Sequence, residues 1–174
     1  MLVASTAMLV ALSLSGCFAQ ETPDATSSPV PSQTPVFATE EEALAAATEA
    51  YEKYLKVSDA IFADMGRNPE RLLSVATREQ YERELVGYKQ LIAGKLHGAG
   101  QTHISTTTFQ QFDNAGAVIY ACVDLSDTDL LNSKGESQVP PKREDYYATE
   151  VTLVLEREKL IVSSDIPWAG QAKC

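Results

Sequence analysis

The chain has 174 residues, 44% of them hydrophobic and 22% charged, and its formal net charge is −10. This acidic balance argues against a nucleic-acid-binding protein and against docking on an anionic membrane through surface charge. It favours an exported protein that a negative surface keeps soluble.

Residues 1–16 carry no charged side chain and are mostly apolar. Such a run is typical of a signal peptide, and it is short and rich in Ser and Thr for a bilayer span, which needs about 20 apolar residues. It ends in Leu14-Ser15-Gly16-Cys17, which resembles the lipobox of bacterial lipoproteins. The resemblance implies that residues 1–16 are cleaved off and that a diacylglycerol is attached to the Cys17 thiol. Acidic exported proteins of this kind are most familiar from actinobacteria.

The leader departs from the usual pattern because no Lys or Arg precedes the apolar run. Either the translation start lies upstream of Met1 or the leader is unusual. An uncleaved membrane helix and a plain secretion signal are the alternatives. We expect the lipid on Cys17 to hold the protein at the cell membrane, facing outside the cytoplasm.

Residues 17–38 are predicted to form a tether behind the lipid. Four of the eight prolines lie there, at positions 23, 29, 31 and 35, among Ser, Thr, Gln and Ala. Such a composition buries too little apolar surface to offset its chain entropy, so we expect an extended, disordered segment. Residues 39–174 are then a single domain, long enough to bury a core.

The three cysteines are assigned by compartment. If Cys17 carries lipid, Cys122 and Cys174 remain. Two thiols in one small exported domain are expected to be oxidised to each other. A reactive thiol or a metal pair is the alternative, but only His97 and His103 could complete such a site, and neither has a ligand spacing with the cysteines.

Three helices are predicted at the start of the domain. Thr39 opens the first as a capping box, and apolar residues recur at helical spacing behind it until residues 65–66. A short helix over residues 69–75 follows, with proline at its first position. Thr77 caps the third helix, which ends near Gly94 and is expected to bury Tyr81, Leu85, Tyr88 (or Val86), Leu91 and Ile92. Tyr51 and Tyr54 of the first helix either line a pocket with their hydroxyls or cover the edge of the core, and we favour the core edge.

Beyond Gly100 the period changes to two, which predicts strands. Residues 102–112 alternate, with Ile104, Thr106 and Thr108 on one face. A turn at residues 113–116 leads to a central strand over residues 117–125, which is apolar on both faces. Residues 126–145 are predicted to be a polar loop that includes Pro140-Pro141. Residues 147–156 and 160–164 form the last two strands, and residues 165–168 end the ladder.

The predicted fold class is therefore α+β, with three N-terminal helices packed on a four-stranded antiparallel sheet. The element order and the terminal Trp168 resemble the nuclear transport factor 2-like, cystatin-related superfamily. The resemblance implies a strongly curved sheet that wraps the first helix into a cone. Relatives commonly have a strand between the second and third helices, whereas residues 72–76 here are short and helix-like.

Enzymes of that superfamily place Asp, His or Tyr inside the cone, so we looked for such a set. His103 begins a strand, and Tyr120 and Asp124 share one face of the next. However, Cys122 lies between them on that face, and a face that carries a disulfide is a poor candidate for an open catalytic cavity. We expect His103 to be a surface residue at a strand end, and no catalytic residue is assigned.

One oxygen-rich cluster follows the second strand: Asp124, Asp127, Asp129, Asn132 and Glu136. Its spacing departs from that of the twelve-residue calcium loop, and no glycine stands at the required turn position. We therefore interpret it as a solvated acidic loop and expect no metal and no cofactor.

Two functional hypotheses follow from the sequence. The first is a lipid-anchored, non-enzymatic binding or accessory module that presents its sheet or concave face to an envelope protein or a small ligand. The alternative is a membrane-tethered enzyme of the cone-fold type, similar to isomerases or dehydratases that process small molecules.

Overall fold

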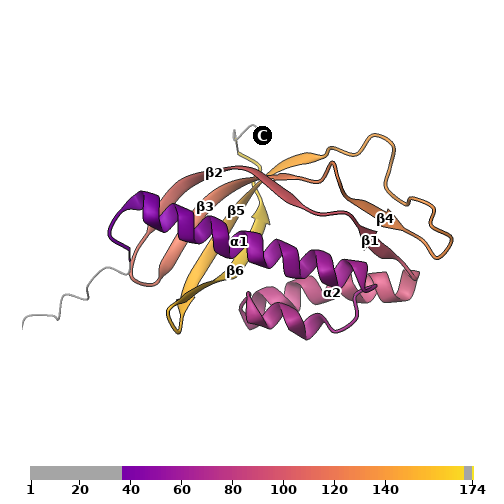
Figure 1. Ribbon diagram of the computed structural model, residues 1–174, viewed down its shortest axis with the longest axis horizontal. Coiled ribbons are helices and arrows are strands. Elements are labelled where there is room, and N and C mark those ends of the chain that lie inside the picture. The colour runs from indigo at the N-terminus through magenta and orange to yellow at the C-terminus, as the bar shows by residue number, and fades with distance from the viewer. Residues whose placement is uncertain (1–36, 171–173) are drawn as a thin grey trace, which may run out of the picture. The chain divides into compact units, whose positions relative to one another are not determined.

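The computed structural model describes residues 37–170 and 174. The predicted signal peptide, Cys17 and nearly all of the tether therefore lie outside the described residues. The element order is α1 (Glu40–Ala63), the 3-10 helix η1 (Pro69–Ser74), α2 (Arg78–Gly94), β1 (His97–Ala99), β2 (His103–Phe112), β3 (Gly116–Asp124), β4 (Asp129–Leu131), β5 (Tyr146–Glu156) and β6 (Lys159–Pro167). The α+β class predicted from the sequence is confirmed (Figure 1). Among these residues no helix combines the length and the apolarity that a membrane crossing requires.

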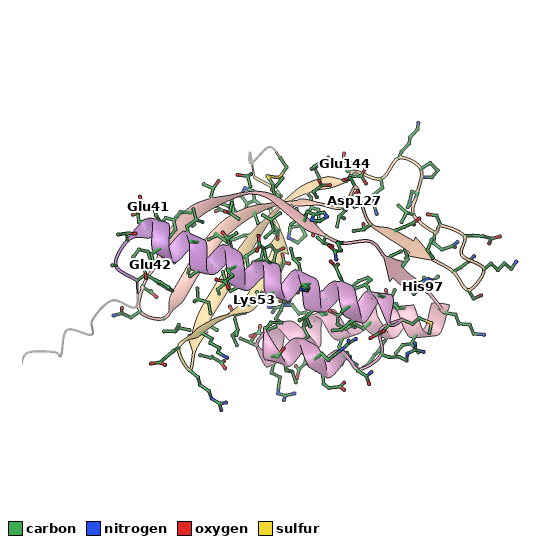
Figure 2. All side chains as sticks on the ribbon, viewed as in Figure 1. Glu41, Glu42, Lys53, His97, Asp127 and Glu144 are labelled. Carbon is green, nitrogen blue, oxygen red and sulfur yellow. A yellow bond between two sulfur atoms is a disulfide. The ribbon has the colours of Figure 1, made fainter. Side chains whose placement is uncertain are left out.

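Helix α1 begins where its capping box predicts. The Thr39 hydroxyl accepts a hydrogen bond from the backbone N–H of Glu42 at 3.2 Å, and Glu42 reaches back to the N–H of Ala38 at 2.9 Å. The first bond satisfies an amide that a helix start otherwise leaves unpaired, and the second ties the residue before the cap to the first turn. The acidic side chains of Glu40, Glu41 and Glu42 occupy the first turn (Figure 2), where the helix dipole favours negative charge.

The prediction of three helices is wrong in part, because only α1 and α2 are α-helices among the described residues. The second predicted helix is a single 3-10 segment that follows Asn68 in the left-handed conformation. Behind it, Ala76 forms one parallel bridge with Val162 of β6. The backbone N–H groups of Thr77 and Val162 each donate to a carbonyl across this bridge, at 2.9 Å. Residues 72–76 thus change from helix-like to strand-like within a few positions.

Helix α2 starts at its predicted cap, where the Thr77 hydroxyl accepts from the N–H of Gln80 at 3.3 Å. Tyr88 and Leu91 are buried as predicted. Ile92, however, is 52% exposed, because it follows Leu91 onto the outer side of the helix. Val86 is exposed as well.

The four-stranded sheet is antiparallel in the order β2-β3-β5-β6, and α1 lies across one of its faces (Figure 1). The expected alternation in β2 is wrong because β-bulges shift the register between Ile104 and Thr106 and between Phe109 and Gln111. One extra residue reverses which side chains face inward. Thr107 therefore faces α1, where its hydroxyl lies 3.0 Å from that of Thr48.

Two more elements differ from the sequence prediction. The segment read as a polar loop contains β4, which pairs with β1 in a separate two-stranded sheet. Strand β6 continues through Asp165 and Ile166 to Pro167, instead of ending at residue 164, and Asp165 pairs with Val151. Pro167 is compatible with this strand because β6 forms an edge of the sheet.

The core lies between α1, α2 and the inner face of the sheet. On β3 the side chains of Ala117, Ile119, Ala121 and Val123 are buried against the helices. This alternation leaves Val118, Tyr120, Cys122 and Asp124 on the opposite face. The two faces of the sheet consequently have separate roles, and the cavity described next lies on the helix side.

Candidate functional site

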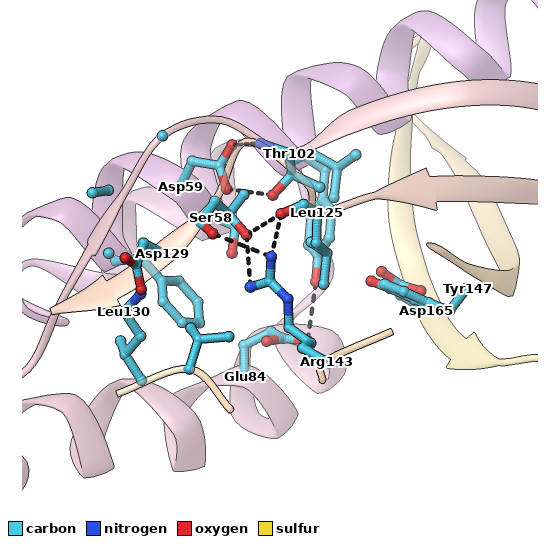
Figure 3. A pocket seen from close by; sticks show the side chains of 18 residues that line it. Ser58, Asp59, Glu84, Thr102, Leu125, Asp129, Leu130, Arg143, Tyr147 and Asp165 are labelled. Carbon is cyan, nitrogen blue, oxygen red and sulfur yellow. Dashed lines mark hydrogen bonds between the residues drawn. The ribbon is translucent and has the colours of Figure 1, made fainter. Parts of the chain in front are cut away.

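A cavity of about 410 Å³ lies between the C-terminal half of α1, the β1–β4 ribbon and the beginning of β5 (Figure 3). Such a volume is at the lower end of the range for small-molecule sites, about 300–1,000 Å³. Its apolar wall comes from α1 and from the segments around β4, and it includes Leu55, Phe62, Leu125, Leu130 and Val139. Its polar groups come from α1, α2, β5 and β6, so the whole fold contributes to one site.

Gly98 allows the β1–β4 ribbon to close one side of the cavity. A Cβ atom at this position would lie 2.7 Å from the Cβ of Phe62, closer than carbon atoms pack. The absence of a side chain therefore permits β1 to approach α1. The sequence alone does not indicate this packing role of Gly98.

Tyr51 and Asp165 form the first polar pair at the site. Tyr51 is fully buried and its hydroxyl donates to Asp165 Oδ2 at 2.9 Å. The other carboxylate oxygen accepts from the Thr149 hydroxyl. Burial raises the pKa of the Asp165 carboxyl, and the hydrogen bonds from Thr149 and Tyr51 partly offset this rise.

Tyr54 and Glu84 form the second pair. The Tyr54 hydroxyl donates to Glu84 Oε1 at 3.1 Å, and the buried amide of Gln80 donates to both groups, at 2.8 and 2.9 Å. Desolvation raises the pKa of Glu84, and the charge of Asp165 raises it further, while Tyr54 and Arg83 lower it. Because Tyr51 and Tyr54 stack with ring centroids 5.9 Å apart, the two pairs stand side by side.

Three tyrosines beside these carboxyls, two buried and one partly buried, are held in their neutral form. Desolvation, followed by the nearby carboxylates, raises the pKa of Tyr54 and of Tyr147 well above the usual value. Burial also raises the pKa of Tyr88 to about 12, although a hydrogen bond with Ser58 opposes the shift. These phenols can therefore donate or accept hydrogen bonds, but they do not supply negative charge at neutral pH.

Arg143 lines the cavity, but its guanidinium is used by the protein itself. It donates to the carbonyls of Leu125 and Thr128 at 2.6 and 3.2 Å and to the Thr128 hydroxyl at 3.2 Å (Figure 3). It also donates to Asp145 at 2.8 Å. These bonds tie the segment before β5 to the loop after β3. Arg143 is therefore a positioning residue that shapes the cavity wall.

The site offers carboxylate and phenol oxygens in an apolar setting. No group of three or more His, Cys, Asp or Glu side chains is placed to hold one metal ion in residues 37–170 and 174. The geometry instead suits a compact organic molecule that presents a hydrogen-bond donor or a positive charge to the carboxyls and an apolar body to the walls.

The cysteines predicted to pair are brought together. Cys122 on β3 and Cys174 at the end of the chain have Cα atoms 5.3 Å apart, and their sulfur atoms lie at bonding distance. This geometry agrees with the expected disulfide. It lies on the sheet face opposite α1, away from the cavity.

The residues considered for catalysis do not meet in the cavity. The His103 side chain is 50% exposed, and its Nε2 lies 3.5 Å from an Asp127 oxygen at the surface. Tyr120 packs against Trp168 on the outer face, with ring centroids 4.7 Å apart. Asp124 accepts from the N–H of Ser126, which lowers the pKa of its carboxyl.

The oxygen-rich cluster is distributed over separate turns. Asp129 accepts from the Ser137 hydroxyl at 2.6 Å, and the Asn132 side chain accepts from the N–H groups of Lys134 and Glu136. These bonds hold the loop around β4 in place. Asp129 alone among the cluster members also lines the cavity.

Sequence reasoning missed the two carboxyls at the centre of the site. Asp165 lies in a segment interpreted as the end of the ladder, and Glu84 looks like any polar residue of an amphipathic helix. The preferred interpretation of Tyr51 and Tyr54 as residues at the core edge holds in part, because both belong to the buried core. Tyr54 also lines the cavity, and the two hydroxyls donate to Asp165 and Glu84. Tyrosines three residues apart on one apolar stripe were the available signal.

No protein-family model matches the chain, and no match was found among curated protein sequences. Among solved structures the chain is similar to the solution NMR structure of a de novo designed β-sheet protein. The identity is 9% and the TM-score 0.36, over 74% of this chain and 93% of the design. A likeness at this level carries no inference about function.

Proposed function

We propose that the protein is a lipid-anchored module of the cell envelope that binds a small organic ligand without transforming it. The cavity between α1 and the β1–β4 ribbon is the observation that supports this proposal. It combines a wall that is mostly apolar with a few convergent polar groups, which is typical of ligand sites. The lipid on Cys17 and the tether behind it would keep this site close to the membrane.

We further propose that the sheet is the curved, cone-like sheet of the nuclear transport factor 2-like superfamily. Support comes from the long first helix on one face of a four-stranded meander and from the bulges in β2, which bend a strand. The strand that relatives carry between their second and third helices would correspond here to the bridge between Ala76 and Val162.

A cavity-filling substitution tests the binding function. Ala99 lies on β1 and lines the cavity, so Ala99→Trp would place an indole in the ligand volume. Ala115→Trp is the matched control, because Ala115 is exposed at the tip of the β2–β3 hairpin. Binding of small aromatic amines, alcohols and carboxylates to the full chain is measured by ligand-observed NMR.

We expect at least one of these probes to bind the unaltered protein and the Ala115→Trp variant, and to lose binding in Ala99→Trp. Equal binding to all three proteins would place the site elsewhere. No binding of any probe to the unaltered protein would refute the proposed function.

The enzymatic alternative is favoured by one observation, the raised pKa of both Glu84 and Asp165 beside neutral phenols. Carboxyls in such surroundings are suited to general acid–base catalysis of a proton transfer. We rank it second because each carboxyl is engaged by tyrosine and a further donor, and because His103 lies outside the cavity. Turnover of any bound ligand that Asp165→Asn abolishes would favour the enzyme.

A further inference from the structure

The charges that line the cavity are unbalanced. Its ionisable lining groups, tyrosines aside, are Asp59, Glu84, Asp129, Asp165 and Arg143. Four carboxylates against one guanidinium give a net charge of −3 when all are ionised. The wall that carries them is mostly apolar, so this charge is poorly solvated inside the cavity.

The one cation does not offset the carboxylates of the inner wall. Arg143 is engaged by Asp145, which lies outside the cavity lining, and by backbone carbonyls. Arg83, the cation that affects Glu84, uses its guanidinium on Gln80, Glu79 and the Ser163 carbonyl. The inner carboxyls therefore have hydrogen-bond donors around them but no direct ion pair in the described part of the chain.

Glu84 retains unused acceptor capacity. Oε1 accepts both of its bonds, from Tyr54 and Gln80, while Oε2 accepts none from the described residues. No side-chain oxygen or nitrogen described by the structure is both buried and without a partner, so Oε2 is not buried. Glu84 itself lines the cavity. Asp165, whose charge acts on Glu84, is the second carboxyl of the same wall.

Aromatic side chains add a second attraction for positive charge. Tyr54, Phe62 and Tyr147 all line the cavity, and Figure 3 shows Tyr147 beside Asp165. An ammonium group gains from the negative face of an aromatic ring, and more so where water is excluded. A carboxylate or phosphate ligand would instead meet like charge on the acidic wall.

We propose that the cavity selects a small organic cation, a protonated amine on an apolar body, with its ammonium group donating to Glu84 and lying near Asp165. The inference rests on the proposed binding function and names its ligand class. An inorganic cation is a poor fit, since the described residues hold no cluster of ligands for one. An amine needs only one or two acceptors and uses the apolar wall for the rest of its surface.

Three compounds with one ring and different charge test the proposal: benzylamine, benzyl alcohol and benzoate. Their affinities for the full chain are measured at pH 7 by ligand-observed NMR. A charge-assisted hydrogen bond predicts that benzylamine binds at least tenfold more tightly than benzyl alcohol, with benzoate weakest. Glu84→Gln should bring the amine within threefold of the alcohol, and Glu82→Gln, two residues away on the exposed side of α2, should leave the preference intact.

A pH measurement on the unaltered protein replaces the variant if Glu84→Gln fails to fold. Protonation of Glu84 removes the acceptor charge, so benzylamine affinity should fall several-fold as the pH drops from 7 to 4, while benzyl alcohol affinity stays constant. The charged or titratable groups that face or act on Glu84 are Tyr54 and Asp59 from α1, Arg83 and Tyr88 from α2, Tyr147 from β5 and Asp165 from β6. Protonation of the other carboxyls in this set would likewise lower the affinity for benzylamine.

The outcomes distinguish a failure of the cation selectivity from a failure of the proposed binding function. Equal affinity for amine and alcohol, or a preference that Glu84→Gln leaves unchanged, would overturn the cation selectivity and leave cavity binding intact. Tightest binding of benzoate would overturn it as well. No binding of any of the three compounds would overturn both proposals together.

Discussion

Replacing Tyr51 by Phe removes one buried hydroxyl that contacts Asp165, a carboxyl lining the cavity. Tyr51 is fully buried, and its hydroxyl donates to Asp165 at 2.9 Å. A hydrogen bond to a charged group contributes about 1.5–3 kcal/mol, against about 1 kcal/mol for a neutral pair. For an ionised Asp165 we therefore expect Tyr51→Phe to lower the free energy of unfolding by about 2 kcal/mol at pH 7.

The pH dependence of this loss follows from the same bond. The Tyr51 hydroxyl lowers the pKa of Asp165, so it stabilises the ionised carboxyl more than the protonated one. The loss should therefore shrink to about 1 kcal/mol once the pH falls below the pKa of Asp165. Urea unfolding of both proteins at pH 7 and at pH 3 measures the difference.

Tyr81→Phe is the control, since Tyr81 is only half-buried and its hydroxyl forms no hydrogen bond with any residue that the structure describes. We expect it to change stability by less than about 0.5 kcal/mol at either pH. If Tyr51→Phe costs no more than Tyr81→Phe, or costs the same at both pH values, the hydroxyl does not support an ionised Asp165 and the description of the site is wrong.

Four further predictions concern the Asp165 carboxyl, the disulfide, the cap of α2 and the lipid anchor. Burial raises the pKa of Asp165 above 3.8, so the protonated carboxyl stabilises the fold below pH 3.8 and this contribution is lost as the pH rises through the folded-state pKa. The free energy of unfolding of the unaltered protein, relative to that of Asp165→Asn, should therefore fall between pH 3 and pH 7. A difference that stays flat or rises would contradict this. Replacing Cys174 by Ser should cost about 4 kcal/mol, from the 52-residue separation of the bridge, and alkylation of Cys122 in the native unaltered protein would show that no bridge exists. Thr77→Ala should cost about 1 kcal/mol in urea unfolding through the lost cap of α2, whereas an unchanged midpoint would mean that the cap contributes nothing. Cys17→Ala should move the protein from the membrane to the soluble fraction and remove the lipid mass, and an unlipidated peptide across residues 15–19 of the exported unaltered protein would refute the anchor.

The elements with strong local signals could be predicted from the sequence. Thr39 and Thr77 start α1 and α2 because their hydroxyls satisfy backbone amides that follow them directly in the chain. The apolar residues of β3 likewise identify a strand, although the core covers only the face that carries Ala117, Ile119, Ala121 and Val123. Such features depend on neighbours within a few residues, so the pattern alone is sufficient.

The elements that shape the site depend on distant partners, and this is why they escaped prediction. Strands β1 and β4 have three residues each and pair with one another across 29 intervening positions. The bulges in β2 reverse its faces without any residue type that marks them. Asp165 is enclosed by Tyr51 and Thr149, which lie 114 and 16 positions away, and Glu84 by Tyr54, 30 positions away.

The division between the two faces of the sheet also became clear only in three dimensions. Alternation along β3 put Tyr120 and Cys122 on one face in both the prediction and the structure. The sequence suggested a search for catalytic residues on that face, whereas the cavity lies on the other, behind α1. The disulfide and the cavity can therefore be altered independently.

A crystal structure of the protein with bound benzylamine tests the central claim most directly. We predict that the amine occupies the cavity beside Phe62, with its nitrogen about 2.7–3.2 Å from Glu84 Oε2 and its ring against the apolar wall. An amine bound only at the protein surface, or seated in the cavity with its nitrogen turned away from both Glu84 and Asp165, would contradict the claim.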